Sequence, residues 1–220
     1  MLKQIPNAIT LVNLSMGCIG LALLSKSDLQ GVAICIGVAL LADFLDGFIA
    51  KLLQATSTIG KQLDSLSDVV SFGVLPGAIV YSFFPSTWLA LFSLALPLAA
   101  ALRLAKFNID ERQNTIFLGL PTPANAIFIL GLMLFSISNS SSWLYHPLAL
   151  SSIVISLAAL MLLEIPLFSL KFERLQWKEN EIKFIFALSS LLLLIFLQSL
   201  GLMLCIVWYV ALSLVEKYRT

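Results

Sequence analysis

Charged residues are scarce in this chain. Only 11% of its 220 residues are Asp, Glu, Lys or Arg, whereas a soluble domain carries about 25%. Hydrophobic residues make up 60%, and the apolar runs are long enough for several membrane crossings at about 20 residues per helix. The composition therefore excludes a water-soluble globule. It predicts an all-α polytopic membrane protein that sits in a lipid bilayer as one membrane-embedded domain over residues 1–220.

Other scarce residues exclude whole classes of chemistry. The single histidine, His146, has no Cys or carboxylate near it in the sequence, which argues against Ser-His-Asp, Cys-His and histidine–zinc sites. Cys18, Cys35 and Cys205 lie far apart in apolar runs, so we expect small core side chains rather than disulfides. Because 13 basic and 12 acidic residues give a net charge of +1, no general basic field exists to bind nucleic acid. The chemistry must use carboxylates, hydroxyls, Lys or Arg.

Apolar runs separated by polar breaks predict about eight transmembrane helices. The first run contains Asn and Thr residues and lacks a small-residue cleavage site, so we interpret it as a retained helix rather than a signal peptide. The last two helices are predicted to be accessory. The expected helices span residues 8–24, 29–53, 59–84, 87–107, 121–138, 146–163, 183–198 and 200–216.

The distribution of basic residues supports this count. With a cytoplasmic N-terminus, 12 of the 13 Lys and Arg residues fall on the cytoplasmic side, and only Lys26 falls outside. Loop charge sets the orientation of membrane proteins in this way. We therefore expect a multi-pass protein of the cell inner (cytoplasmic) membrane with both termini in the cytoplasm. Gly73-x-x-x-Gly77 is compatible with a helix contact, within the chain or between the subunits of a homodimer.

Four of the twelve acidic residues lie inside apolar runs. Asp43 and Asp46 belong to the second run, and Asp64 and Asp68 to the third. Spacings of three and four residues place each pair on one helix face, and a short connector over residues 54–58 can bring the two faces together. Four carboxylates inside a membrane cost roughly 10 kcal/mol, at about 2.5–3.5 kcal/mol each. Their clustering therefore needs a compensating partner.

Hard divalent cations are the partners that an all-oxygen cluster suits, and Mg²⁺ or Mn²⁺ is expected. The alternative, that the four acids merely face water at the cytoplasmic rim, leaves the clustering of like charge unexplained. Gly47, Ala50 and Gly60 are small residues near the acids, which lets a ligand approach the backbone. Lys51, on nearly the same face, supplies a cation for phosphate. This combination favours a site for a diphosphate ligand close to the cytoplasmic interface.

These residues also form a motif with fixed gaps. Asp43-x-x-Asp46-Gly47-x-x-Ala50-Lys51, eight further residues and Gly60-x-x-x-Asp64-x-x-x-Asp68 resemble the signature of the CDP-alcohol phosphotransferases. Where that signature has Arg, this chain has Lys51, which keeps the charge but loses bidentate phosphate geometry.

The resemblance implies the fold of that family and a metal-dependent phosphotransferase with a cytoplasmic active site. It implies that the four aspartates hold one or two divalent metals and that Asp68 is also the catalytic base. The residues that it implies for the nucleotide and diphosphate of CDP-diacylglycerol are Asp43, Gly47, Lys51 and Gly60.

Segments that flank the motif resemble the bacterial branch of the family that uses serine. They lie at residues 5–13, 62–73, 103–108 and 119–124. This similarity implies transfer of the phosphatidyl group from CDP-diacylglycerol to L-serine, which yields phosphatidylserine and CMP in phospholipid biosynthesis.

Several alternatives remain open at the level of sequence. Arg103, Lys106 and Asn108 are candidates to hold the serine carboxylate or a phosphate, or they only set the topology. Asn7, Thr10 and Asn13 either face the cytidine or bond neighbouring helices. The acceptor alcohol could instead be glycerol 3-phosphate or an inositol phosphate. A cation or proton transporter is a further alternative, although it predicts acids spread through the membrane depth.

Overall fold

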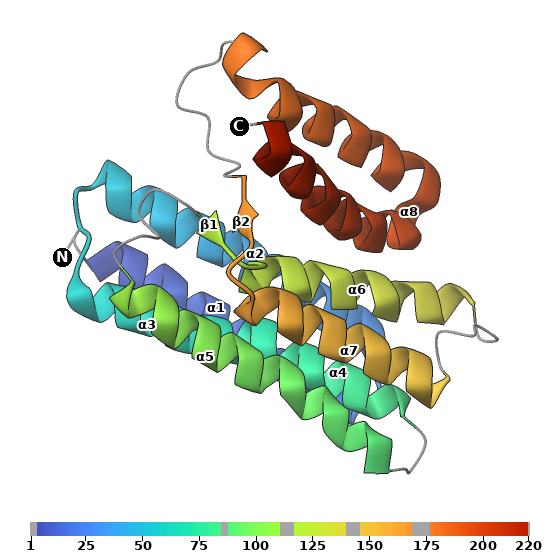
Figure 1. Ribbon diagram of the computed structural model, residues 1–220. Helices are drawn as coiled ribbons and strands as arrows, with labels where there is room; N and C mark the ends of the chain where they lie inside the picture. Colours follow the sequence, from blue (N-terminus) through green and yellow to red (C-terminus); the bar gives the residue numbers. More distant parts are fainter. Residues whose placement is uncertain (1–3, 85–87, 111–116, 140–145, 169–176, 220) are drawn as a thin grey trace.

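The computed structural model describes residues 4–84, 88–110, 117–139, 146–168 and 177–219. Four residues of the predicted charge asymmetry, Lys3, Arg112, Lys171 and Arg174, lie outside this set. The described part is almost entirely helical (Figure 1). The π-helix η2 (Val69–Val74) joins α3 to α4, and the 3₁₀ helix η3 (Trp88–Leu94) precedes α5. The α-helices are α1 (Ile5–Ser25), α2 (Leu29–Leu52), α3 (Thr58–Asp68), α4 (Leu75–Phe83), α5 (Ala95–Ile109), α6 (Thr122–Ser138), α7 (Pro147–Leu162) and α8 (Trp177–Arg219).

Capping residues mark where two of the first three helices begin. Asp28 accepts a hydrogen bond from the Gly31 backbone N–H at 2.9 Å, and Ser57 accepts one from the Gly60 N–H at 3.0 Å. Each cap satisfies a donor that the first helical turn leaves unpaired. Proline stands in the first turn of α1, α6 and α7, where no backbone N–H is needed. These local signals keep the connectors before α2 and α3 short.

The apolar helices make the chain a multi-pass membrane protein, as the sequence predicts. Five helical segments are long and apolar enough to cross a membrane by length and composition. α6 and α7 are shorter apolar helices of 17 and 16 residues. The number of crossings therefore stays a prediction. The five segments are Ile5–Ser25, Leu29–Leu52, Thr58–Phe83, Trp88–Ile109 and Asn180–Glu216.

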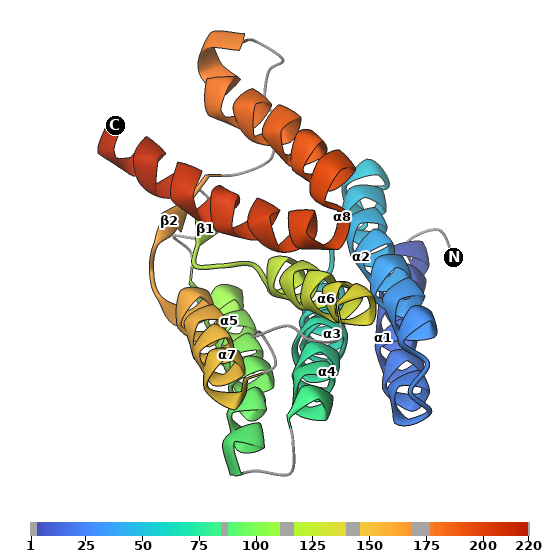
Figure 2. The ribbon, with the colours of Figure 1, turned by 90° about the vertical axis from the view of Figure 1, so that its right-hand side faces the viewer.

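The continuous segment α3–η2–α4 lies at the centre of the bundle. Figure 2 shows α1 and α2 on one side of it and α5 and α7 on the other. In the most apolar 18-residue window of this segment 56% of the residues are buried, whereas in the corresponding window of α1 only 22% are buried. Phe72, Leu75 and Ile79 are fully buried in the core. The second half of the acidic motif therefore reaches the core only at its last residue, Asp68, because within α3 only Ser67 and Asp68 are buried.

α8 folds back on itself at Gln198, where the backbone is not helical (φ 46°, ψ −115°). The two arms, residues 177–197 and 199–219, lie side by side (Figure 1), and Trp208 Nε1 donates to Ser189 Oγ across them at 2.9 Å. The second arm packs on α6, because a Cβ on Gly131 would lie 2.9 Å from Leu202 Cβ. The arms correspond to the helices that we expected at residues 183–198 and 200–216.

Two short strands were not predicted. β1 (Phe117–Leu118) pairs antiparallel with β2 (Pro166–Leu167). Gly119 follows β1 with φ 71°, and its N–H donates to Ile165 O at 2.9 Å. A Cβ there would lie 2.7 Å from Met161 O, so only glycine fits both the conformation and the space. This turn fixes where α6 begins.

One expectation about small residues is corrected and another is confirmed. Cys35 and Cys205 are buried, but Cys18 is exposed, because α1 presents it on the outer face, where an apolar thiol suits lipid as well as a core. Gly73 and Gly77 pack inside the chain: added Cβ atoms would lie 2.9 Å from Ala100 Cβ and 3.0 Å from Pro97 Cδ, respectively. The small-residue pattern is therefore explained without a second subunit.

Gly17 and Gly37 provide a matched test of the helix packing. A Cβ on Gly17 would lie 2.5 Å from Ser71 Oγ, whereas one on Gly37 meets nothing within 4 Å. We expect Gly17→Ala to lower the free energy of unfolding by about 1–3 kcal/mol through overpacking. Gly37→Ala should leave it unchanged or raise it by up to about 1 kcal/mol. Unfolding in detergent micelles measures both, and equal stability of the two variants would contradict this packing.

Candidate active site

Three of the four intramembrane acids converge. Asp43 of α2 and Asp64 and Asp68 of α3 each place one carboxylate oxygen within 4.8 Å of the others. α2 and α3 are joined by the short turn at residues 53–57, in which Gln54 has φ 49°. Asp68 is buried and the other two are half-buried. The convergence that the spacing predicts is therefore present for these three.

Asp46 lies outside this three-residue group. Its carboxylate accepts a hydrogen bond from Thr10 Oγ1 at 2.5 Å, and it is only 6% exposed. Three residues after Asp43, its side chain turns towards α1, although its charge still acts on Asp64. Asp46 therefore borders the carboxylate cluster, held by a hydroxyl of a neighbouring helix.

α1 is tied to α3 by further polar contacts. Asn13 Nδ2 donates to Asp68 Oδ1 at 3.2 Å. In the opposite direction Ser67 Oγ donates to Thr10 O at 3.2 Å, and Ser71 Oγ donates to Asn13 O at 2.8 Å. Thr10 and Asn13 thus bond neighbouring helices, as one of the two alternatives predicts, and Thr10 also lines the cavity beside the acids. Both side chains bond to carboxylates of the predicted site.

The sequence interpretation missed one residue that contacts the cluster. Thr122, at the start of α6, is fully buried and donates from Oγ1 to Asp68 Oδ2 at 3.2 Å. Asn125, one turn later, donates from Nδ2 to Phe72 O at 2.9 Å within the π-helix η2. A hydroxyl residue between Pro121 and Pro123, at the head of an apolar helix, was the available signal. Its partner could not be read from the sequence.

The carboxylate cluster has the chemistry of a hard-cation site. Three like charges within 4.8 Å repel one another strongly where the surroundings are apolar. Among the described residues, the buried Asp64 Oδ1 has no hydrogen-bond partner. Oxygen ligands from several carboxylates are what Mg²⁺ and Mn²⁺ prefer. Asp43, Asp64 and Asp68 therefore fit a divalent cation.

A cavity of about 700 Å³ adjoins the cluster between α1, α2 and α3. A Cβ on Gly47 would meet nothing within 4 Å, whereas one on Gly60 would lie 2.9 Å from Asn7 Oδ1. Gly47 therefore opens the cavity, and Gly60 makes room for Asn7. The lining combines acids, cations and small residues. It includes Asn7, Thr10, Asp46, Gly47, Ala50, Lys51, Gly60, Lys61, Asp64 and Asn108.

Arg103, Lys106 and Asn108 do not share one cavity. Asn108 lines the large cavity and donates from Nδ2 to Ser65 Oγ at 2.9 Å. Arg103 and Lys106 line a separate space of about 30 Å³, together with Asp110 and Glu164, which has room for about one water molecule. Arg103 is 6% exposed, and its charge interacts with that of Asp68. Asn108 therefore contacts α3 within the motif, whereas Arg103 and Lys106 line a different space.

Comparison with known proteins identifies relatives of this chain. It is 29% identical over 204 residues to the CDP-diacylglycerol–serine O-phosphatidyltransferase of Methanocaldococcus jannaschii, covering 93% of this chain and 90% of that protein. The enzyme of the same name from Bacillus subtilis is 30% identical over 167 residues, 74% of this chain and 89% of its own length. The one from Mycobacterium leprae is 31% identical over 153 residues, which cover 64% of this chain.

The chain spans about half the length (50%) of the mycobacterial relative but most of the other two. The family model described as CDP-alcohol phosphatidyltransferase matches residues 3–164. This range contains the carboxylate cluster, the cavity that adjoins it and Thr122, and it ends before α8. The chain belongs to the CDP-alcohol phosphatidyltransferase family.

Proposed function

We propose that this protein transfers the phosphatidyl group of CDP-diacylglycerol to L-serine and releases CMP. The observation that carries the proposal is the convergence of Asp43, Asp64 and Asp68 within 4.8 Å, beside a cavity lined by Lys51 and Lys61. A divalent cation at the acids and lysines along the wall suit a nucleoside diphosphate. Relatives that carry the serine transferase name support this acceptor.

The proposed metal is Mg²⁺ or Mn²⁺, held by Asp43, Asp64 and Asp68 with Asp46 beside them. Once bound, the ion offsets the negative charge of the diphosphate and of the departing CMP. Lys51 contacts the diphosphate as a point charge. Asp43, Gly47 and Gly60 bind the nucleotide side of the substrate, where Gly47 leaves open space. These residues hold the substrate phosphate next to the carboxylates.

Asp68 acts as the general base. The serine oxygen forms a new bond to the β-phosphorus of CDP-diacylglycerol, the bond from that phosphorus to CMP breaks, and the hydroxyl proton passes to the Asp68 carboxylate. A carboxylate next to a weak alcohol nucleophile contributes typically 10²–10⁴-fold to the rate.

Arg103 is the proposed contact for the serine carboxylate, with Lys106 next to it. The charge of Arg103 interacts with that of Asp68. Its guanidinium carbon lies 5.9 Å from the centre of the Phe107 ring. The surrounding cations and acids, Arg103 and Lys106 with Asp110 and Glu164, match a zwitterion better than a phosphorylated alcohol. Lys106 is exposed, so its side chain can move to admit serine. Asn108 belongs with the wall of the large cavity.

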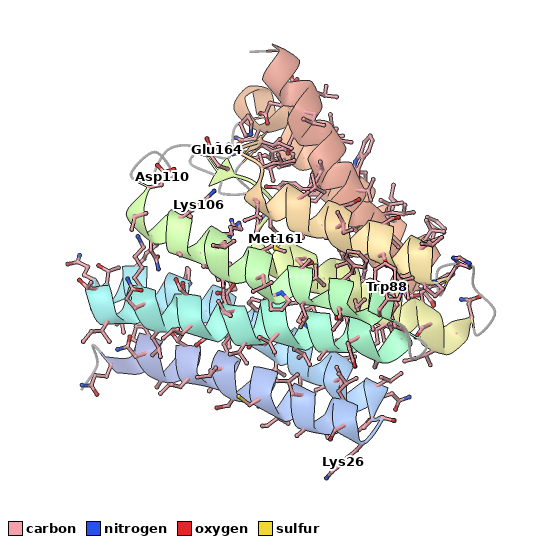
Figure 3. All side chains as sticks on the ribbon, turned by 60° about the horizontal axis from the view of Figure 1, so that its bottom comes forward. Lys26, Trp88, Lys106, Asp110, Met161 and Glu164 are labelled. Carbon is pink, nitrogen blue, oxygen red and sulfur yellow. The ribbon has the colours of Figure 1, made fainter. Side chains whose placement is uncertain are left out.

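The active site is proposed to face the cytoplasm, with both termini on the same side. Lys106, Asp110 and Glu164 lie at one end of the bundle, and Lys26 and Trp88 lie at the other (Figure 3). Basic connectors mark the cytoplasmic side, which is also where serine and CMP dissolve. Residues 1–220 form one catalytic domain in the inner membrane. Within this domain, α8 is accessory.

Release of CMP from CDP-diacylglycerol tests the proposed reaction. Purified protein with Mg²⁺ or Mn²⁺ should release CMP with serine and form phosphatidylserine, measured by chromatography and mass spectrometry. Glycerol 3-phosphate and inositol phosphate, offered separately, should give at most background release. Release with another alcohol alone would refute serine as acceptor, and release with none would refute the enzyme. Asp68→Asn should abolish turnover while CDP still binds.

Substitution of Asp64 by Asn should change stability in opposite directions with and without metal. Without metal, the variant loses one of three repelling charges and should unfold at a higher temperature than the original chain. With Mn²⁺ at about 100 times its Kd, the original chain should gain about 2.7 kcal/mol, and the variant much less. Asp28→Asn, a helix cap at which Asn serves as well as Asp, is the control. Equal metal stabilisation of all three proteins would rule out this metal site.

Replacement of Arg103 by Ala should raise the KM for serine and change the KM for CDP-diacylglycerol little. Loss of a charged hydrogen bond costs about 1.5–3 kcal/mol, so the serine KM should rise by about 10- to 150-fold at 1.4 kcal/mol per factor of ten. Steady-state kinetics with each substrate varied in turn measures both. An unchanged serine KM would remove Arg103 from the acceptor site.

A further inference from the structure

We infer that Thr122 and Asn13 are positioning residues that jointly fix the orientation of the Asp68 carboxylate. The inference rests on the proposed function, in which Asp68 is the base. Each oxygen of Asp68 accepts one hydrogen bond from a different helix. Asn13 Nδ2 of α1 reaches Oδ1 at 3.2 Å, and Thr122 Oγ1 of α6 reaches Oδ2 at 3.2 Å. Two donors on opposite oxygens prevent rotation of the carboxylate plane.

The backbone around Asp68 shows why such a clamp is needed. Asp68 is the last residue of α3, and the π-helix η2 begins at Val69. A π-helical stretch widens the helix and changes the direction in which side chains leave it. The clamp therefore restores a defined direction to Asp68 at the point where the helical register changes. α1, α6 and the central segment α3–η2 all meet there.

Thr122 differs from the buried residues Ser93 and Ser151 in where its hydroxyl proton goes, and it resembles Thr10, which also donates to a carboxylate of another helix. Ser93 and Ser151 donate to carbonyls three or four residues earlier in the same chain segment, which is the usual arrangement within helices. Thr122 stands at the very start of α6, directly after Pro121 in extended conformation. Its hydroxyl is directed at another helix instead, and the side chain is fully buried.

The turn before α6 holds Thr122 in place. Gly119 N–H donates to Ile165 O at 2.9 Å, and Leu120 N–H donates to Leu160 O at 2.8 Å. The positive φ of Gly119 and the pairing of β1 with β2 thus attach the start of α6 to the end of α7. Asn13 is equally fixed, because its carbonyl accepts from Ser71 Oγ at 2.8 Å and its side chain is fully buried.

The chemistry of the two donors suits a positioning role. A hydroxyl and an amide are neutral, so they orient Asp68 without forming an ion pair that would compete for its charge. Residues that orient a metal-binding or catalytic group in this way typically contribute 10–100-fold to activity or metal affinity. Thr122 and Asn13 thus support Asp68 through geometry and do not themselves touch the substrate.

Substitution of Thr122 by Val, which keeps the shape and removes the hydroxyl, tests the clamp. We expect Thr122→Val to lower kcat and Mn²⁺ affinity by about tenfold or more, whereas Thr122→Ser, which restores the donor, stays within about threefold. The KM for CDP-diacylglycerol should not change. Steady-state kinetics and electron paramagnetic resonance of free Mn²⁺ measure these quantities. Ser151→Ala, which removes a buried hydroxyl bonded only to its own helix, is the matched control.

A second variant keeps the test decisive if Thr122→Val fails to fold. Asn13→Ala should show the same loss of kcat and Mn²⁺ affinity, and the double variant should lose less than the product of the two single losses, because both donors hold one carboxylate. Effects confined to the KM for CDP-diacylglycerol, or losses no larger than in Ser151→Ala, would overturn the clamp. Absence of serine-dependent CMP release in the original chain would refute the proposed function instead, and the Mn²⁺ measurement would still test the clamp.

Discussion

Mutual repulsion among Asp43, Asp64 and Asp68 is the constraint on which the arrangement of this protein depends. Their oxygens lie within 4.8 Å of one another, in helices apolar enough to cross a membrane. An apolar environment strengthens that repulsion, so the metal-free bundle must hold its own site together. A bound cation attracts all three carboxylates, so the net electrostatic interaction at the site becomes favourable. The same crowding that opposes folding without metal therefore produces strong binding with it.

Neighbouring helices oppose this repulsion through neutral donors and close packing. Thr10 and Asn13 of α1 and Thr122 of α6 donate to the carboxylates, and none of them brings a charge. Close approach is possible because Gly17 has no side chain: a Cβ there would lie 2.5 Å from Ser71 Oγ. Packing and chemistry are thus coupled: a change that moves α1 away from both α2 and α3 weakens the bond to Asp46 of α2 and the bond to Asp68 of α3 together.

Much of the fold and part of the site follow from local sequence patterns. Apolar runs predict the helices, and the spacing of Asp64 and Asp68 predicts that they share a face. Contacts between distant segments have no such signal. The bond from Thr122 to Asp68 joins residues 54 positions apart, and the pairing of β1 with β2 rests on only two residues in each strand. Asp46 contacts Thr10 instead of joining the other three acids. Residues three positions apart on a helix point in somewhat different directions, and the packing of α1 determines which neighbour Asp46 meets.

The central claim is that Asp43, Asp64 and Asp68 together hold a divalent cation. Anomalous diffraction at the manganese edge, from crystals of the protein grown with Mn²⁺, tests it most directly. The account predicts an anomalous peak bounded by these three carboxylates. A fully ordered bundle with no peak among them, or with manganese bound only elsewhere, would contradict it.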